Sequence, residues 1–181
     1  MDIKVRELLK CVGILVVSMA VLLFFSAAMK PLEIGNLKKE QQKLMEQLLP
    51  GSENFEEEAY EGEDENINKV FRGEDGYVIE TVTHGYVDEM TLWVGVNLDG
   101  DVTGVMVEDI AETWGLGQKV MTDMTFLEQF VDGTGEAVVG ENVDALTGAT
   151  VSSKAVSRAV NSAVAFVTGA DIASGATEWG G

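Results

Sequence analysis

Residues 90–108, MTLWVGVNLDGDVTGVMVE, decide the fold. Both halves of this stretch approach a period-two pattern of apolar residues, and the turn sequence LDGD separates the halves. Alternation on either side of a Gly-containing turn is typical of a β-hairpin. The runs KVFR (69–72) and YVIETVT (77–83) precede it and are separated by GEDG. We therefore expect an antiparallel meander of about four strands.

Helical patterns follow the expected meander. Residues 122–131, TDMTFLEQFV, predict a short amphipathic helix that Thr122 or Asp123 caps. Residues 132–145 are rich in turn residues and hold one possible short strand. Residues 151–167 predict a longer helix with one buried face. The residues of this face are Val151, Ala155, Ala159, Ala163 and Val167, with Val156, Val160 and Val164 alongside. Strands followed by segregated helices indicate an α+β domain over residues 68–168, with a tail at 169–181.

The N-terminal part of the chain has a different composition. Residues 12–29 are an uncharged apolar run of 18, about the minimum for a helix that crosses a hydrocarbon core roughly 30 Å thick. Small residues at 26 and 28 leave a cleaved signal peptide as the alternative. We expect a transmembrane signal anchor that follows a tail at 1–11. Residues 37–49 predict a stalk helix ended by Pro50-Gly51, and the acidic residues 52–68 predict a solvated linker or long loop, so that 30–67 is stalk and linker.

Charge and cysteine content restrict the location and the partners. The basic residues are densest in the tail at 1–11, and a long downstream domain translocates largely regardless of its charge. We expect the N-terminus in the cytoplasm and the α+β domain on the other side of the cell membrane. A formal net charge of −19 argues against nucleic acid as a partner. Cys11 is the only cysteine and His84 the only histidine, so we expect no metal centre built from these ligands.

Residues 144–153, DALTGATVSS, contain the pattern that best fits a binding or reactive site. The small residues Gly148 and Ala149 allow close approach of the backbone, and Thr150 stands at the start of the expected helix. Free N–H groups and the positive end of the helix dipole favour a phosphate there. Hydroxyls come from Thr147, Thr150, Ser152 and Ser153, and a cation from Lys154. The alternative is plain helix capping by a hydroxyl residue.

Together with ETWGLG (112–117) and the meander, DALTGATVSS resembles the FMN-binding domain of the G subunit of the Rnf electron-transport complex. The related C subunit of the sodium-pumping NADH:quinone reductase shares this domain. The resemblance covers roughly residues 75–167 and matches the family motif D-x-x-[ST]-G-A-T-x-[ST]. It implies that a flavin transferase esterifies the phosphate of FMN to Thr150, which makes the chain a covalent flavoprotein and, in that sense, a phosphoprotein.

The resemblance also implies which residues surround the cofactor. Besides Thr150, these are Thr147, Gly148, Ala149, Ser152, Ser153 and Lys154 from the motif and the following helix, and Glu112, Thr113, Leu116 and Gly117 from the loop before the helices. The chain departs from the usual H-x-E-T-P-G-L-G loop of the family, because it has Ile110 at the histidine position and Trp114 at the proline position. Trp114 could stack on the flavin ring or on the body of the domain.

A second, shorter copy of the motif lies near the C-terminus. Residues 171–177, DIASGAT, make Thr177 a rival acceptor. It lacks the following hydroxyl residue, and Glu178 would repel a phosphate. The chain also ends four residues later, too soon for a helix to follow. We expect Thr150 to be the acceptor.

The function that the resemblance implies is that of an electron carrier. The chain would be a redox subunit of a complex that couples electron transfer between ferredoxin and NAD to the movement of sodium or protons, and it would not be catalytic alone. Its partners would be the other Rnf subunits in the membrane, with a flavin transferase during maturation. The alternatives are the C subunit of the quinone reductase, a stand-alone exported flavoprotein of extracellular electron transfer, and an anchored acidic domain without a cofactor.

Overall fold

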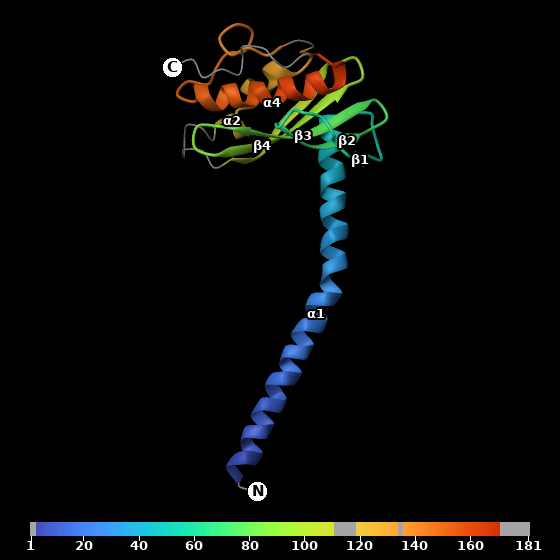
Figure 1. The fold of residues 1–181 in the computed structure, drawn as a ribbon, viewed down its shortest axis with the longest axis vertical. Helices are drawn as coiled ribbons and strands as arrows, with labels where there is room; N and C mark the ends of the chain where they lie inside the picture. Colours follow the sequence, from blue (N-terminus) through green and yellow to red (C-terminus); the bar gives the residue numbers. More distant parts are fainter. Residues whose placement is uncertain (1–2, 111–118, 134–135, 171–181) are drawn as a thin grey trace. The chain divides into compact units, whose positions relative to one another are not determined.

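The computed structural model describes residues 3–110, 119–133 and 136–170, with side chains described outside 3–9, 11, 25–36, 109 and 110. The chain divides into two compact units, Met1–Gln41 and Gln42–Gly181. The second unit contains the sheet and all helices except most of α1 (Figure 1).

Helix α1, Ile3–Leu48, makes up the described part of the first unit and continues into the second, and it ends just before Pro50-Gly51 as expected. Its described apolar side chains between residues 12 and 24 are 49–74 % exposed. These are Val12, Ile14, Leu15, Val16, Val17, Met19, Val21, Leu22, Leu23 and Phe24. Judged on the described residues, the structure has no helix with the length and apolar character needed to cross a membrane.

The second unit is organised by a five-stranded antiparallel sheet in the order β1-β2-β3-β4-β5. Its strands are β1 (Glu56–Glu58), β2 (Ile67–Arg72), β3 (Gly76–His84), β4 (Glu89–Asn97) and β5 (Val102–Ile110). The last four are the predicted meander, so the antiparallel α+β fold class is confirmed.

Strand β1 corrects the expectation of a linker or loop for residues 52–68. Its three glutamates are paired with residues 70–72 of β2. Strand pairing is made by backbone groups, so an edge strand needs no apolar side chains of its own. Phe55, just before β1, is buried and fixes the start of the strand on the sheet. The acidic composition gave no sign of strand β1, which is anchored to the sheet by Phe55.

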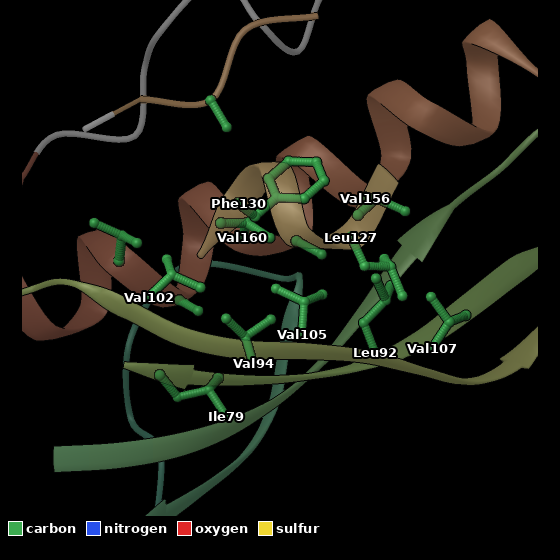
Figure 2. Close-up of a cluster of buried hydrophobic side chains, with 14 of the residues drawn as sticks. Ile79, Leu92, Val94, Val102, Val105, Val107, Leu127, Phe130, Val156 and Val160 are labelled. Atoms are coloured by element: carbon green, nitrogen blue, oxygen red, sulfur yellow. The ribbon is translucent and has the colours of Figure 1, made fainter. Parts of the chain in front are cut away.

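Helix α4, Thr150–Thr168, covers one face of the sheet (Figure 1). The core between them takes alternate residues of β4, Met90, Leu92, Val94 and Val96, all of which are fully buried. Figure 2 shows Val156 and Val160 of α4 above Leu92, Val94 and Val105 of the sheet. The predicted helix face is confirmed at 155, 156, 159, 160, 163 and 164, whereas Val151 and Val167 at its ends are half-buried.

The opposite face of the sheet packs against the last turns of α1. Met45, Leu48 and Leu49 are buried there with Phe71 and Trp93. The fit is close, because a Cβ added to Gly95 of β4 would collide with the carbonyl group of Leu48. The hydroxyl of Thr103 donates a hydrogen bond to the same carbonyl. The end of α1, predicted as part of a stalk, therefore belongs to the compact domain.

The segment between β5 and α4 contains short helical pieces. Helix α2 (Lys119–Thr122) comes before most of the predicted helix at 122–131, which is itself divided into α3 (Met124–Leu127) and the 3-10 helix η1 (Glu128–Phe130). Asp123 is the N-cap of α3, and its carboxylate accepts a hydrogen bond from the Phe126 N–H at 3.2 Å. This confirms one of the two predicted caps. The possible strand in 132–145 is an isolated bridge between Val139 and Val143.

Candidate functional site

The candidate site is the turn that leads into α4. The N–H of Ala149 donates to the carbonyl of Leu146 at 2.9 Å, and Gly148, the third residue of this turn, has a φ of +81°. A positive φ at the third position is what a type II turn requires and what glycine adopts without strain. Gly148 therefore sets the direction in which the chain enters the helix.

Two side chains hold this turn in place. The Ser153 hydroxyl accepts a hydrogen bond from the Leu146 N–H at 3.1 Å and donates one to the Ala149 carbonyl at 2.9 Å. The Gln129 side chain holds the start of the segment, because its Oε1 accepts from the Asp144 N–H at 2.8 Å and its Nε2 donates to the Asp144 carbonyl at 3.3 Å. The backbone of residues 144–149 is thus fixed at both ends.

The start of α4 has no side-chain cap. Ala149 occupies the N-cap position, and no side-chain hydrogen bond caps the helix there. The alternative expectation of plain hydroxyl capping is therefore wrong for this helix. The first intrahelical bond is donated by the Ser153 N–H to the Ala149 carbonyl at 2.8 Å. The N–H groups of residues 150–152 come before that bond, and the positive end of the helix dipole lies there.

The predicted hydroxyl residues divide into two pairs. Thr147 and Thr150 are exposed, whereas Ser152 and Ser153 are 1 % and 0 % exposed. The Ser153 hydroxyl is engaged by the turn itself. The hydroxyls open to a reacting molecule are therefore those of the two threonines, and Thr150 is the one at the first residue of the helix.

Two partly buried cations lie on the helix face that carries Thr150. Lys154 and Arg158 follow Thr150 at intervals of four residues, which places all three on one side of α4. Arg158 donates a hydrogen bond from Nη2 to the carbonyl of His84, at the end of β3. Burial lowers the pKa of the Arg158 guanidinium from its usual value. The His84 side chain itself is exposed.

Other predicted site residues fall outside the described chain. Glu112, Thr113, Trp114, Leu116 and Gly117 lie in 111–118, and the rival acceptor Thr177 lies in 171–181. Sequence reasoning missed Gln129, which fixes the backbone at Asp144. No sequence pattern predicts this role, because Gln129 lies in a short helical piece, fifteen residues before Asp144.

The residues present at the turn fit a flavin phosphate. A glycine turn lets a bulky group approach the backbone, and an exposed hydroxyl is available for a phosphoester. The N–H groups at the start of a long helix and a lysine one turn further on suit an anion. The donor set is therefore compatible with a bound phosphate.

Comparison with known protein families gives the class of this domain. A family model described as the FMN-binding domain matches residues 85–165, which include the turn, Thr150 and both cations. Residues 85–165 therefore form an FMN-binding domain by family.

A relative that matches most of the chain identifies the family more narrowly. The G subunit of the ion-translocating oxidoreductase complex of Methanosarcina acetivorans is 34% identical over 181 residues, which cover 90% of this chain and 96% of that protein. The chain belongs to the family formed by the G subunits of ion-translocating oxidoreductase complexes. This confirms the resemblance that the sequence motifs indicated.

Two further relatives match over about half of their length. The G subunit of the Na(+)-translocating ferredoxin:NAD(+) oxidoreductase complex of Acetobacterium woodii is 35% identical over 98 residues, 49% of this chain and 47% of the relative. The G subunit of the proton-translocating ferredoxin:NAD(+) oxidoreductase complex of Clostridium ljungdahlii is 36% identical over 99 residues, 51% and 53% of the two chains. This chain is thus a redox subunit by family.

Proposed function

We propose that this chain is an electron-carrier subunit of an ion-translocating ferredoxin:NAD oxidoreductase complex, with FMN joined to Thr150 through a phosphoester. The observation that carries the proposal is the exposed Thr150 at the first residue of α4, directly after a turn fixed by Gly148, Ser153 and Gln129. The match of residues 85–165 to an FMN-binding family supports the choice of cofactor.

The protein holds and orients the cofactor in this proposal. Bound FMN supplies the electron-transfer chemistry. The oxygen of Thr150 would carry the phosphoester, the N–H groups of residues 150–152 would donate to the phosphate, and Lys154 would offset its charge. Thr147, Gly148, Ala149, Ser152 and Ser153 would surround the ester, and we include Glu112, Thr113, Leu116 and Gly117 in the proposed cofactor-binding set on the resemblance alone. A covalent tether keeps the flavin at a high local concentration even outside the cell.

Membrane attachment through residues 12–29 is part of the same proposal. The exposed apolar side chains between Val12 and Phe24 support it, because such a surface is costly in water and stable in hydrocarbon. The N-terminus would be cytoplasmic and the FMN-binding domain extracytoplasmic. Alkaline carbonate extraction of membranes tests the anchor: the full chain should stay in the pellet, and release into the supernatant contradicts it.

The partners are proposed to be the other subunits of the complex, with a flavin transferase needed for maturation. Purification from the native membrane in mild detergent tests this point. Co-purification of further redox subunits supports the complex. Recovery of this chain alone would favour a stand-alone exported flavoprotein.

Peptide mass spectrometry tests the covalent bond. The chain is purified from its native host, or after co-expression with a flavin transferase, and each peptide containing Gly-Ala-Thr is measured. We expect the mass of FMN less one water on the peptide with Thr150, and complete loss of that mass in Thr150→Ala. Modification at Thr177 would move the site to the C-terminal tail, and an unmodified chain would contradict covalent attachment.

A further inference from the structure

The positive charge on helix α4 requires a physical explanation, because carboxylates outnumber cations so strongly in this protein. The whole chain has 31 acidic and 12 basic residues. Two cations of the sheet are neutralised locally: Lys69 pairs with Glu80 at 3.0 Å and Arg72 with Glu58 at 3.5 Å. Within the described part of the chain, neither Lys154 nor Arg158 pairs with a carboxylate.

Arg158 is the more informative of the two cations. Its guanidinium is half-buried, and burial of a charge without a counter-charge is costly. A carboxylate neighbour would favour the charged form, yet the pKa is lowered by desolvation. The one described acceptor is the neutral carbonyl of His84. A fixed, partly desolvated positive charge is therefore held in place without an anion from the described part of the protein.

The position of this charge relative to Thr150 follows from helix geometry. Arg158 lies eight residues after Thr150, about 12 Å along the axis, and Lys154 lies halfway between them. Long side chains on a helix lean toward its N-terminus, so the Arg158 head covers the turn nearer Thr150. The end of β3 runs beside this part of α4, because the Thr83 hydroxyl donates to the Ala155 carbonyl at 3.1 Å. The hydrogen bond to His84 then fixes the guanidinium on this side of the helix.

We propose that Arg158 is the counter-charge of the reduced flavin ring, with Lys154 serving the phosphate end of the same cofactor. Two-electron reduction of FMN with uptake of one proton leaves a reduced ring with one negative charge, whereas the oxidised ring is neutral. A fixed cation near the ring therefore stabilises the reduced form selectively and raises the midpoint potential. The inference rests on the proposed attachment at Thr150, and Arg158 is a positioning and electrostatic residue for electron transfer.

The test is a redox titration of the full chain loaded with FMN by a co-expressed flavin transferase, with dithionite as reductant and mediator dyes present. We expect Arg158→Gln to shift the ratio of oxidised to reduced flavin about tenfold toward the oxidised form at a given potential. For a two-electron couple this equals about 30 mV toward more negative potential. Arg158→Lys, which keeps the charge, should remain closer to the wild type. Lys154→Gln should shift the potential in the same direction by less.

Arg72→Gln is the matched control, since it removes the same charge from an exposed, paired arginine on β2. Arg158→Gln and Lys154→Gln potentials that lie no further from the wild type than that of Arg72→Gln would overturn the inference. If Arg158→Gln does not accept flavin, Arg158→Met, which also removes the charge, is titrated in its place and compared with Arg72→Gln in the same way. Wild-type protein without FMN on Thr150 would instead contradict the proposed function, so the two failures are distinguishable.

Discussion

Gly148 shows how one residue can set the geometry of the candidate site. Its φ of +81° belongs to the left-handed region, where a side chain costs roughly 1–2 kcal/mol. The turn that it forms delivers Thr150 to the first position of α4. Stability and flavin attachment should therefore both depend on this glycine.

Gly148→Ala is expected to lower the free energy of unfolding by about 1–2 kcal/mol and to reduce the fraction of chains carrying FMN. Chemical denaturation measures the first effect and flavin absorbance per chain the second. Gly140→Ala is the matched control, because Gly140 also has a positive φ, +92°, with no atom near its added Cβ. It should lose similar stability with full loading, and equal loading in both variants would contradict the role of Gly148.

The division of hydroxyls between exposed threonines and buried serines could not be predicted from the sequence. Four hydroxyl residues within a short stretch look equivalent in a pattern. In the folded domain Ser153 makes hydrogen bonds at 3.1 and 2.9 Å with the turn, because the i to i+4 spacing aims its side chain back at Ala149. Thr150, at the start of the same helix, stays exposed.

At the scale of elements, α4 is joined to the preceding loop by one buried amide. The Asn161 Oδ1 accepts from the Ala137 N–H at 2.8 Å, and its Nδ2 donates to the Ala137 carbonyl at 3.1 Å. Asn142 makes an analogous pair of bonds to Val138 and Glu136 on the exposed side of the loop. The two asparagines differ in burial and in range, because Asn161 joins α4 to the loop whereas Asn142 bonds within the loop.

Asn161→Ala is expected to destabilise the domain strongly, because each buried backbone group left without a partner costs about 1–3 kcal/mol. Asn142→Ala should cost less, since water can replace its bonds. Thermal unfolding of both variants gives the comparison. Equal losses of stability would show that burial of the amide is not the deciding factor.

The elements with strong periodicity were predictable and those without it were not. Strands β2 to β5 and helix α4 have alternating or helical patterns of apolar residues, and each was found within a few positions of its predicted bounds. Strand β1 consists of three glutamates and is made by backbone pairing with β2. The helix expected at 122–131 has the right cap, but its continuation is divided into short pieces. Where such a helix is interrupted depends on tertiary packing, which the sequence pattern does not contain.

At the scale of the whole molecule, the division into two compact units falls between Gln41 and Gln42, within helix α1. The sequence suggested a domain beginning near residue 68, because the meander starts there. The pattern could not reveal that Met45, Leu48 and Leu49 cover the second face of the sheet. Their spacing suits a stalk helix equally well.

Truncation distinguishes the two parts of α1. A chain that begins at residue 42 is expected to fold and to accept FMN, because it keeps the whole second unit. A chain that begins at residue 50 lacks three buried residues, each of which contributes about 2–5 kcal/mol, against a total stability of about 5–15 kcal/mol for a domain. It should be unfolded or close to it. Circular dichroism melting of both proteins checks this, and equal melting temperatures would contradict the packing described.

The three glutamates of β1 have a further consequence for aggregation at high protein concentration. An open sheet edge is a template on which another chain can add a strand, and this is a common route to aggregation. Strand β1, one of the two edge strands, is short and has a glutamate at every position, Glu56 to Glu58. A second copy that approached with the same strand would meet like charges side by side. The acidic segment, which the sequence predicts as a linker, therefore disfavours pairing of two copies of the chain through their β1 edges.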